Sequence, residues 1–441
     1  MHTNPKTPAI ARRTLVLTAA VVVSVMLLAA HPVQAKETVL YNQQGNAGAP
    51  VCDLVAGSNG VLYGTAVSGG GSVFALTPPA EGQTNWTETI LYQFQGGTDG
   101  EYPYVGLIPD GQGGFFGTTS QGGGGPCDFE GSGCGTVYHM APPAEGQTNW
   151  TETVLYRFQG GSDGEIPSGR LLLNATTGVL YGVTYVGGPS NAGTVFALTP
   201  PAEGQTNWTE TVLYAFTGDL DGGYPFAYLT PDASGNLYGT TEAGGFTGNG
   251  TVFELTPPAA GQTNWTETVL YSFLGWGFGD GGDPSAGLVF DASGNLYGTT
   301  DAGGGPPLYL NDGTVFELSP PSAGETNWTE TILYAFTGGK DGSLAANDIL
   351  IDRNGVIYST TLGGGKSEFG TVFKLTPPAA GETAWTEKVL YSFKKVPDGN
   401  YPDAGLTVGK VGKDVVLFGT TIHGGTADGT VFEITGSGFA P

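Results

Sequence analysis

Basic residues, histidine and cysteine are scarce in this chain. Its 441 residues include 15 Lys and Arg against 40 Asp and Glu, with 4 His and 3 Cys. A surface with so few cations repels phosphate groups, so nucleic acids and anionic membrane surfaces are poor partners. The excess negative charge suits cations or neutral, hydroxyl-rich ligands, or it only keeps the protein soluble.

Long apolar runs are also missing, apart from one near the N-terminus. Three basic residues precede an apolar run at 15–30, and the small residues of VQA follow at 33–35. This order predicts a secretory signal peptide over residues 1–35, cleaved after Ala35. An uncleaved anchor is disfavoured because the run is shorter than the about 20 residues that span a bilayer. We therefore expect a mature chain, 36–441, with a net charge of −28 and no membrane span, at the cell exterior or in the periplasm.

Two of the three cysteines bracket the insertion CDFEGSGC. In an oxidising compartment, this spacing predicts a local disulfide between Cys127 and Cys134. Cys52 is then left over, and we expect it to be buried as a small apolar residue. Glycine (77) and proline (29) recur at fixed places between apolar runs, which indicates ordered turns and not disorder.

Helical periodicity is missing from the mature chain, and three short strings recur instead, seven times each. The string Glu-Thr/Lys-Val/Ile-Leu-Tyr begins at Glu37, Glu88, Glu152, Glu210, Glu267, Glu330 and Glu387. The string Gly-Thr/Ser-Val-Phe/Tyr begins at Gly71, Gly135, Gly193, Gly250, Gly313, Gly370 and Gly429. The third string, of the form LYGTT, is centred on Tyr63, Phe116, Tyr181, Tyr238, Tyr297, Tyr358 and Phe418.

Each repeat contains four short runs rich in Val, Leu, Tyr, Phe and Thr, separated by turn residues. In residues 287–336 these runs are GLVFD, NLYGTT, GTVFEL and WTETILYAF, which we name strands a, b, c and d. Repeats of 51 to 64 residues with four antiparallel strands are typical of propeller blades. The sequence therefore predicts an all-β protein that forms one seven-bladed β-propeller.

The two ends of the repeat array are truncated in a complementary way. The array opens with only a strand d, KETVLY at 36–41, and ends after the strand c that finishes near Thr435. If the N-terminal strand pairs beside the last strand c, the ring closes and leaves no open sheet edge. A solenoid is the alternative, but it needs polar caps at both ends. We therefore expect a single closed domain over 36–441.

The strings LYGTT, GTVF and LTPP, with the glycine pair after LYGTT, resemble the GloVer tandem repeat of exported bacterial proteins with varied C-terminal anchors. The resemblance covers 37–435, and the pattern P-x-x-G-L-x-x-D-x-x-G-N-L-Y is also similar to NHL and kelch-like propeller repeats. It implies an exported propeller and supplies no activity or catalytic residues. The final GSGFAP departs from the family pattern because it has no sorting motif, so we expect free secretion.

Sequence variation among the repeats gathers in two kinds of link. The c–d link PPAEGQTNWTET occurs unchanged at 78–89, 142–153 and 200–211, whereas the b–c and d–a links differ in length and content. In an up-and-down blade, these variable links share one rim of the ring. That rim is the candidate site, unless its loops only tolerate insertions.

Two sets of rim residues could bind a ligand. Six d–a links carry an aspartate followed by glycine, at Asp99, Asp163, Asp221, Asp280, Asp341 and Asp398. Around one mouth these carboxylates could hold Ca²⁺, or each could cap its own turn. The rim aromatics are Tyr102, Tyr104, Tyr185, Tyr224, Phe246, Trp276, Phe278 and Tyr309. Their faces could stack on sugar rings, or they could pack between blades.

Catalytic residue types are few. Asp53 and Asp348 stand in strands a where the other copies mostly have glycine, so they could form an acid/base pair at the channel. His423, in a b–c link, is a third candidate base. A sialidase-like site is not expected because the arginines fall on different elements, and no metal-ligand motif or phosphate-binding loop occurs.

From these features we predict an exported, monomeric and non-enzymatic propeller that binds an extracellular carbohydrate or protein. A polysaccharide lyase or hydrolase with carboxylates near the channel is the first alternative. A purely architectural surface protein is the second. No cofactor is expected apart from the Ca²⁺ considered above.

Overall fold

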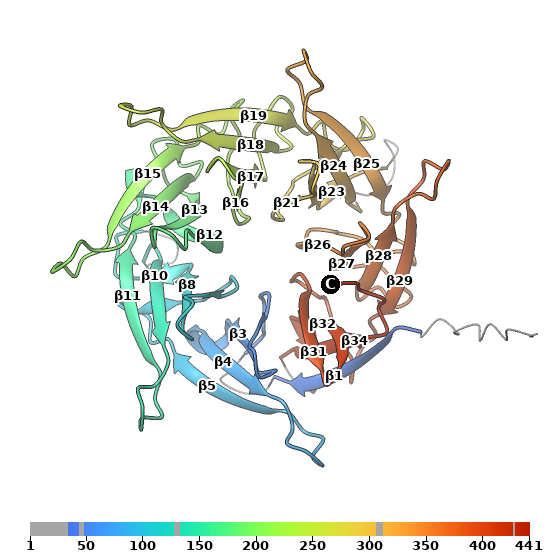
Figure 1. Cartoon of the computed structure of the whole chain (residues 1–441), viewed down its shortest axis with the longest axis horizontal. Helices are drawn as coiled ribbons and strands as arrows, with labels where there is room; N and C mark the ends of the chain where they lie inside the picture. Colours follow the sequence, from blue (N-terminus) through green and yellow to red (C-terminus); the bar gives the residue numbers. More distant parts are fainter. Residues whose placement is uncertain (1–33, 44–47, 128–132, 306–311, 427) are drawn as a thin grey trace, which may run out of the picture. The chain divides into compact units, whose positions relative to one another are not determined.

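The computed structural model describes residues 34–43, 48–127, 133–305, 312–426 and 428–441, all within one compact unit, Gln34–Pro441. In this part of the chain, seven antiparallel sheets of four strands surround a central axis (Figure 1). The prediction of an all-β, seven-bladed propeller is confirmed. Cleavage after Ala35 stays a prediction.

Each blade runs from strand a beside the channel to strand d on the outside (Figure 1). Strands a are β2 (Val55–Ala56), β7 (Ile108–Pro109), β12 (Glu165–Leu173), β16 (Thr230–Pro231), β21 (Val289–Phe290), β26 (Leu350–Ile351) and β31 (Thr407–Val411). Strands b are β3 (Leu62–Ala66), β8 (Phe115–Thr119), β13 (Leu180–Val186), β17 (Leu237–Thr241), β22 (Leu296–Thr300), β27 (Ile357–Thr361) and β32 (Asp414–Thr421). Strands c are β4 (Ser72–Thr77), β10 (Thr136–Ala141), β14 (Thr194–Thr199), β18 (Thr251–Thr256), β24 (Thr314–Ser319), β28 (Thr371–Thr376) and β34 (Thr430–Thr435). Strands d are β5 (Thr87–Gln93), β11 (Thr151–Arg157), β15 (Thr209–Ala215), β19 (Thr266–Ser272), β25 (Thr329–Ala335), β29 (Thr386–Ser392) and, for blade 7, β1 (Lys36–Asn42).

The repeated residues explain the blade locally, as blade 4 illustrates. Asp232 in the a–b turn accepts hydrogen bonds from the backbone N–H groups of Ser234 and Asn236, at 2.8 and 2.9 Å, which fixes the turn. Gly239 of β17 is required because a Cβ there would lie 2.6 Å from the ring of Phe253 in strand c. The missing side chain lets a large aromatic ring lie flat across the sheet.

Adjacent blades pack through pairs of buried aromatic rings. In six seams, the phenylalanine after strand d meets the aromatic residue of strand c in the next blade, with centroids 5.0 to 5.2 Å apart. These pairs are Phe94–Tyr138, Phe158–Phe196, Phe216–Phe253, Phe273–Phe316, Phe336–Phe373 and Phe393–Phe432. In the seam between blades 7 and 1, the buried Gln43 takes the place of this phenylalanine.

The ring is closed by the N-terminal strand, as the truncated repeats predicted. Strand β1 pairs antiparallel with β34, from Lys36 opposite Thr435 to Asn42 opposite Thr430. The ladder is irregular between Val39 and Tyr41, where the other c–d ladders are irregular too. Strand β1 therefore completes blade 7 in the same geometry as a covalently continuous strand d.

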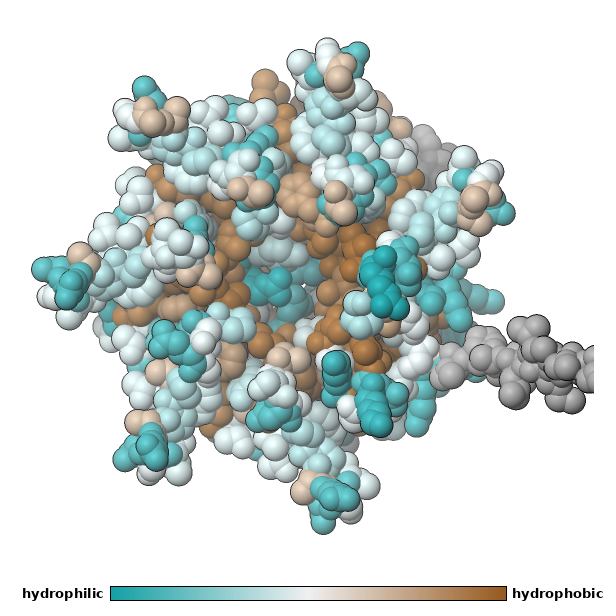
Figure 2. All heavy atoms as spheres, in the orientation of Figure 1, coloured by the Kyte–Doolittle hydropathy of each residue, from teal (hydrophilic) through white to brown (hydrophobic). Residues whose placement is uncertain are grey.

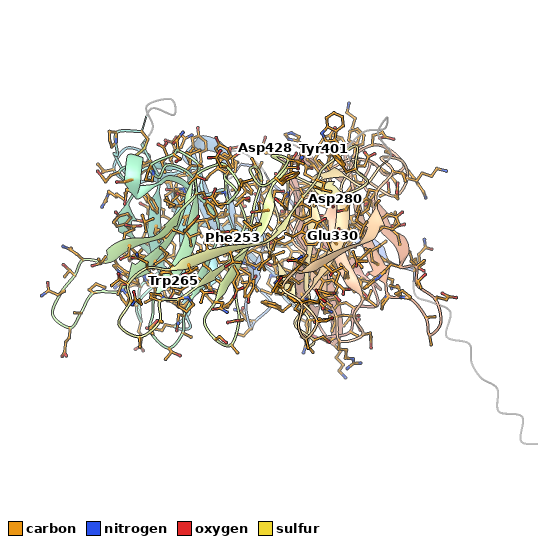
Figure 3. The ribbon with its side chains drawn as sticks, turned by 90° about the horizontal axis from the view of Figure 1, so that it is seen from above. Phe253, Trp265, Asp280, Glu330, Tyr401 and Asp428 are labelled. Atoms are coloured by element: carbon orange, nitrogen blue, oxygen red, sulfur yellow. A yellow bond between two sulfur atoms is a disulfide. The ribbon has the colours of Figure 1, made fainter. Side chains whose placement is uncertain are left out.

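The links divide between the two faces of the ring. Figure 3 shows Tyr401 and Asp428, from a d–a and a b–c link, toward one end of the ring, and Trp265, beside a c–d link, toward the other. We call the first end the mouth face. Three short ladders join d–a links to b–c links there: β6 (Gly100–Glu101) with β9 (Gln121–Gly122), β20 (Gly281–Gly282) with β23 (Ala302–Gly303), and β30 (Gly399–Asn400) with β33 (His423–Gly424). The 3-10 turns η2 (Ser68–Gly70) and η3 (Gly161–Asp163) also belong to these links.

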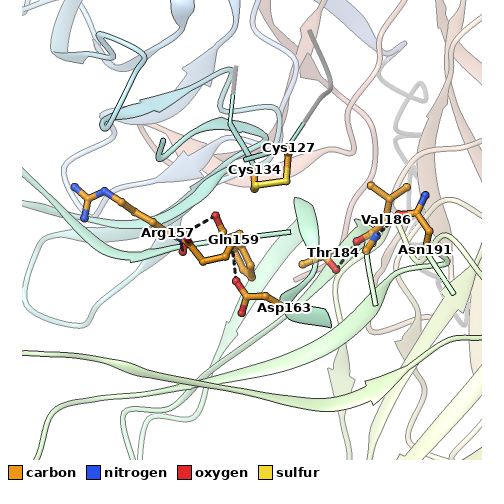
Figure 4. Close-up of a disulfide and its surroundings, with 10 residues drawn as sticks. Cys127, Cys134, Arg157, Gln159, Asp163, Thr184, Val186 and Asn191 are labelled. Atoms are coloured by element: carbon orange, nitrogen blue, oxygen red, sulfur yellow. Dashed lines mark hydrogen bonds between the residues drawn. A yellow bond between two sulfur atoms is a disulfide. The ribbon is translucent and has the colours of Figure 1, made fainter. Parts of the chain in front are cut away.

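A disulfide joins Cys127 to Cys134 in the b–c link of blade 2 (Figure 4). It lies beside the d–a link that carries Asp163, whose carboxylate accepts the backbone N–H of Gln159 at 2.6 Å. Cys52 is free and buried.

No helix in the described ranges is long and apolar enough to cross a membrane.

Candidate functional site: the channel cavity

Seven equivalent positions line the channel, one directly before the Leu or Ile that leads into each strand a. We call them the channel ring, and they are Asp53, Gly106, Arg170, Tyr228, Gly287, Asp348 and Gly405. All but Gly287 line a cavity of about 110 Å³. Figure 2 shows hydrophilic side chains at the centre of the propeller, surrounded by apolar side chains of the blades.

Hydrogen bonds between neighbouring blades hold these positions in place. In five seams a threonine hydroxyl of strand b donates to the carbonyl just before the next blade's channel-ring residue, at 2.9 to 3.2 Å. The bonds run from Thr65 to Val105, Thr240 to Ala286, Thr299 to Asn347, Thr360 to Ala404 and Thr420 to Cys52. The LYGTT repeat thus supplies the group that fixes the channel wall.

Blade 3 departs from this pattern and places a cation in the channel. Its strand a, β12, is irregular between Ser168 and Leu172. Gly169 has a φ of +68°, and a Cβ there would lie 2.5 Å from the carbonyl oxygen of Ala227, so only glycine fits. The next residue, Arg170, then reaches across the ring to blade 1.

Four side chains fill the cavity floor. Arg170 donates to Asp53 with an Nη1–Oδ2 distance of 3.3 Å, and its guanidinium carbon lies 4.6 Å from the centre of the Tyr228 ring. Asp348 accepts the backbone N–H of Gly287 at 2.8 Å. We call Asp53, Arg170, Tyr228 and Asp348 the floor quartet.

The glycines of the channel ring make room for the floor quartet. A Cβ on Gly287 would lie 2.2 Å from the ring of Tyr228. A Cβ on Gly405 would lie 2.8 Å from the Cβ of Asp348 and 3.0 Å from Oδ1 of Asp53. The glycines of the channel ring therefore leave the space that the side chains of Tyr228, Asp348 and Asp53 occupy.

The charges of the floor quartet are strongly coupled. Burial, followed by the charge of Asp53, raises the pKa of Asp348 to about 7, although Arg170 acts in the opposite direction. Burial lowers the pKa of Arg170, but the carboxylates of Asp53 and Asp348 outweigh that effect and raise it. On this floor the guanidinium of Arg170 stays charged, and Asp348 can carry a proton near neutral pH.

Aromatic side chains stand above the floor. Tyr104 and Phe226 line the cavity and stay 51% and 42% exposed. The ring of Tyr104 lies 6.3 Å from that of Tyr102, and Phe226 lies 5.9 Å from Tyr185. Of the rim aromatics singled out in the sequence, Tyr104 lines the cavity itself, and Phe226, which was not among them, joins it. Sugar stacking stays a prediction.

A second hollow of about 300 Å³ lies on the mouth face over blades 3 to 5, lined by Tyr185, Tyr224, Glu242, Ala243, Asp283, Ser285 and Asp301. Tyr185 donates its hydroxyl to Glu242 at 2.9 Å. Burial raises the pKa of Glu242, Asp283 and Asp301. This side of the mouth is acidic and carries no basic lining residue among those described.

The six rim aspartates lie in the d–a links, and each is bonded within its own turn. Each accepts the hydroxyl of the tyrosine in its own strand d, at 2.6 to 3.1 Å. Each also accepts a nearby backbone N–H, as Asp99 does from Gln95 at 2.9 Å. They therefore lie beside the outermost strands and not around one mouth, which agrees with the alternative that they cap their own turns. A role for Asp99, Asp163, Asp221, Asp280, Asp341 and Asp398 in ligand binding stays a prediction.

The other predicted residues fall at different places. Trp276 is 62% exposed in a d–a link, away from the cavity lining, and Tyr309 lies outside the described residues. His423 packs edge-on against Tyr401 and does not line the cavity. In the part of the chain that is described, the one group of three His, Cys, Asp or Glu close enough for a metal is Cys127, Cys134 and Glu165, where the cysteines are bonded to each other. Ca²⁺ binding stays a prediction.

The structure brings Asp53 and Asp348 together, as the sequence suggested, but adds two partners that sequence reasoning missed. Arg170 counted only as one of the arginines on different elements, and Tyr228 was not considered. Aligning the seven repeats at the residue before the leucine or isoleucine of strand a would have revealed both.

Comparisons with known proteins agree with this architecture. The Gloeobacter/Verrucomicrobia repeat family matches residues 26–230 and 128–347. A catalytically inactive virginiamycin B lyase from Staphylococcus aureus, solved with quinupristin, is 12% identical with a TM-score of 0.50, over 91% of this chain and 99% of that one. A putative 6-phosphogluconolactonase from Bacteroides uniformis is 13% identical with a TM-score of 0.47, over 76% and 84%. No curated protein matches, and at such identities the solved structures share the fold alone.

Proposed function

The chain belongs to the Gloeobacter/Verrucomicrobia repeat family, and we propose that it is an exported, non-enzymatic propeller whose channel mouth binds a neutral, hydroxyl-rich saccharide. Export rests on the signal peptide predicted over residues 1–35. Saccharide binding is inferred from the side chains that line the channel cavity.

One observation carries the proposal: exposed aromatic faces and an ion pair line the same small cavity. Tyr104 and Phe226 offer apolar faces at the mouth, and Asp53 and Arg170 offer an acceptor and donors below. Sugars present both kinds of surface, since their C–H faces stack on aromatic rings and their hydroxyls pair with charged groups.

The size of the cavity sets the mode of binding. Pockets that enclose a whole small ligand measure about 300–1,000 Å³, whereas this one holds about 110 Å³. A sugar ring therefore lies across the mouth against the aromatic faces, with one edge or substituent reaching the floor quartet. A chain end or a side branch of a glycan fits this geometry better than the middle of a linear polymer.

Isothermal titration against neutral, acidic and amino oligosaccharides tests the proposal. We expect a neutral member to bind, and Tyr104→Ala and Phe226→Ala each to weaken it about 10-fold, the equivalent of about 1.4 kcal/mol for one stacking contact. Leu220→Ala is the matched control, because Leu220 is 68% exposed in a d–a link outside the cavity. Binding that survives both aromatic changes would refute the site, and a panel without any binder would favour an architectural role.

A second candidate function is supported by the carboxyl pair. Asp348, with a pKa of about 7, lies beside Asp53, as a general acid lies beside a carboxylate in enzymes that cleave polysaccharides. Turnover of a polysaccharide that disappears in Asp348→Asn, while oligosaccharide binding persists, would favour a lyase or hydrolase. Turnover that continues in Asp53→Asn and Asp348→Asn would remove both residues from consideration.

A further inference from the structure

A glutamate with an unsatisfied carboxylate oxygen recurs in every seam between blades. It is the second residue of each strand d, at Glu37, Glu88, Glu152, Glu210, Glu267, Glu330 and Glu387. In all seven, Oε1 is buried without a hydrogen-bond partner. We call these residues the seam glutamates. A buried, unpaired carboxylate oxygen is costly, and a pattern present in every seam is a property of the fold.

In six seams the glutamate faces a second carboxylate. The facing aspartate belongs to the link after strand d of the preceding blade, and the pairs are Glu152 with Asp99, Glu210 with Asp163, Glu267 with Asp221, Glu330 with Asp280, Glu387 with Asp341 and Glu37 with Asp398. Each aspartate is held in place by its tyrosine hydroxyl, as Asp221 is by Tyr214 at 2.9 Å. The charge of the aspartate therefore acts on the glutamate across the seam, and the aspartate is not free to turn away.

Cations face two of these pairs. Arg157 acts on Glu152, and Lys394 acts on Glu37, which also faces Tyr391 and Glu433. The pairs at Glu210, Glu267 and Glu330 have no cation among the groups that act on the glutamate, so proton uptake is the way to relieve their repulsion. Glu387 and Asp341 share a hollow with Lys340 and Lys366.

The seventh seam, between blades 7 and 1, is built differently. Glu88 faces Tyr41 and Gln43, both on or next to the N-terminal strand, and no aspartate acts on it. A neutral amide thus replaces the second carboxylate at the seam between blades 7 and 1. This seam is a natural control for the other six.

We propose that the six carboxyl pairs make the propeller a pH-sensitive ring. In mildly acidic surroundings each glutamate keeps a proton, and the seam is tight; in alkaline surroundings the proton leaves, two carboxylates face each other, and the seam loosens. The seam between blades 7 and 1, with Gln43, stays the least affected.

The expected titration range agrees with this arrangement. Burial, and then the charge of the facing aspartate, raises the pKa of Glu37, Glu152, Glu267, Glu330 and Glu387 from 4.5 to about 7, and that of Glu210 to about 8. Because the folded pKa exceeds the unfolded one, the stabilisation is complete below about pH 4.5 and is lost as the pH rises through 7 to 8. The seam glutamates are partly exposed, so solvent weakens each effect.

Thermal unfolding of the full mature chain between pH 5 and 9 tests the device. We expect the unfolding midpoint to fall as the pH rises from 6 to 8.5. At pH 7, unfolding should release about one to three protons from the six partly protonated glutamates. Calorimetry detects this release, because the unfolding enthalpy then depends on the ionisation enthalpy of the buffer. Glu267→Gln should raise the midpoint at pH 8.5 by about 1 °C and leave it unchanged at pH 5. Asp221→Asn also alters its turn, so it should shift the midpoint by a different amount at the two pH values, more favourably at pH 8.5. Changing all six glutamates to glutamine should flatten the profile.

Glu88→Gln is the matched control, and it should change the pH profile least. If the variant with all six glutamates changed to glutamine does not fold, Glu267→Gln and Asp221→Asn alone test whether the seams are pH-sensitive. The inference fails if Glu267→Gln and Asp221→Asn shift the midpoint equally at pH 5 and 8.5, or if Glu88→Gln changes the profile as much as they do.

Discussion

Removing the guanidinium from the channel floor should destabilise the propeller in a pH-dependent way. In Arg170→Met, the alkyl stem is roughly preserved, but Asp53 and Asp348 then face each other without a cation. Breaking a buried ion pair by removing one partner costs about 3–5 kcal/mol. The side chains of Arg170 and Asp53 keep 34% and 16% exposure, which places the cost nearer 2–3 kcal/mol, or a fall in midpoint of about 3 °C for a chain of this length.

The pH dependence distinguishes this loss from a packing defect. Without Arg170 the folded pKa of Asp348 rises further above the unfolded value, so the stability that its bound proton contributes is kept in acid and lost as the pH rises. We therefore expect Arg170→Met to unfold more easily than wild type at pH 8 and much less so at pH 5, measured by urea denaturation with equal m-values. The neutral triple variant Asp53→Asn/Arg170→Met/Asp348→Asn is the control, and it should recover most of the loss at pH 8. A loss under about 0.5 kcal/mol at pH 8, or one equal at both pH values, would refute the account of the floor.

Three further changes probe packing at the seams, the channel ring and the loop. Phe316→Ala, at a fully buried interblade ring, should cost about 3–5 kcal/mol in denaturant unfolding, and a loss under 1 kcal/mol would contradict the aromatic seams. Gly287→Ala should displace Tyr228 and cost about 1–3 kcal/mol, with weaker saccharide binding by titration; unchanged binding and stability would show that the ring tolerates a methyl group. Cys127→Ser/Cys134→Ser opens a loop with a sequence separation of 7 and should lower stability by about 2 kcal/mol, while a sheet rearrangement seen by circular dichroism would contradict a purely local role.

The architecture could be predicted from the sequence because each repeat carries its own local signals. The turn at Asp232 and the glycine at Gly239 act within one blade, so a single copy is sufficient to identify them. The closure followed from counting strands, since a lone strand d at the start matches a missing one at the end.

The channel floor was predicted only in part because it depends on one irregular strand. Asp53 and Asp348 stood out against the glycines of other copies. Arg170 reaches the channel only through the irregularity of β12 and the left-handed Gly169, which no pairwise spacing in the sequence reveals. For the rim aspartates, the sequence left a choice between a shared mouth and a cap for each turn. In five of the six links the aspartate follows a tyrosine by seven residues, as Asp99 follows Tyr92, and this spacing indicates a hydrogen bond beside strand d.

The floor quartet depends on a closed ring, because its residues come from blades 1, 3, 4 and 6 and every blade must be in place to bring them together. Thermal unfolding of the mature chain lacking residues 36–43 is the most direct measurement. We expect the unfolding midpoint to fall by at least about 10 °C, because blade 7 loses its whole outer strand and the pairing of β1 with β34. A truncated chain that unfolds at the same temperature as the intact one would contradict it.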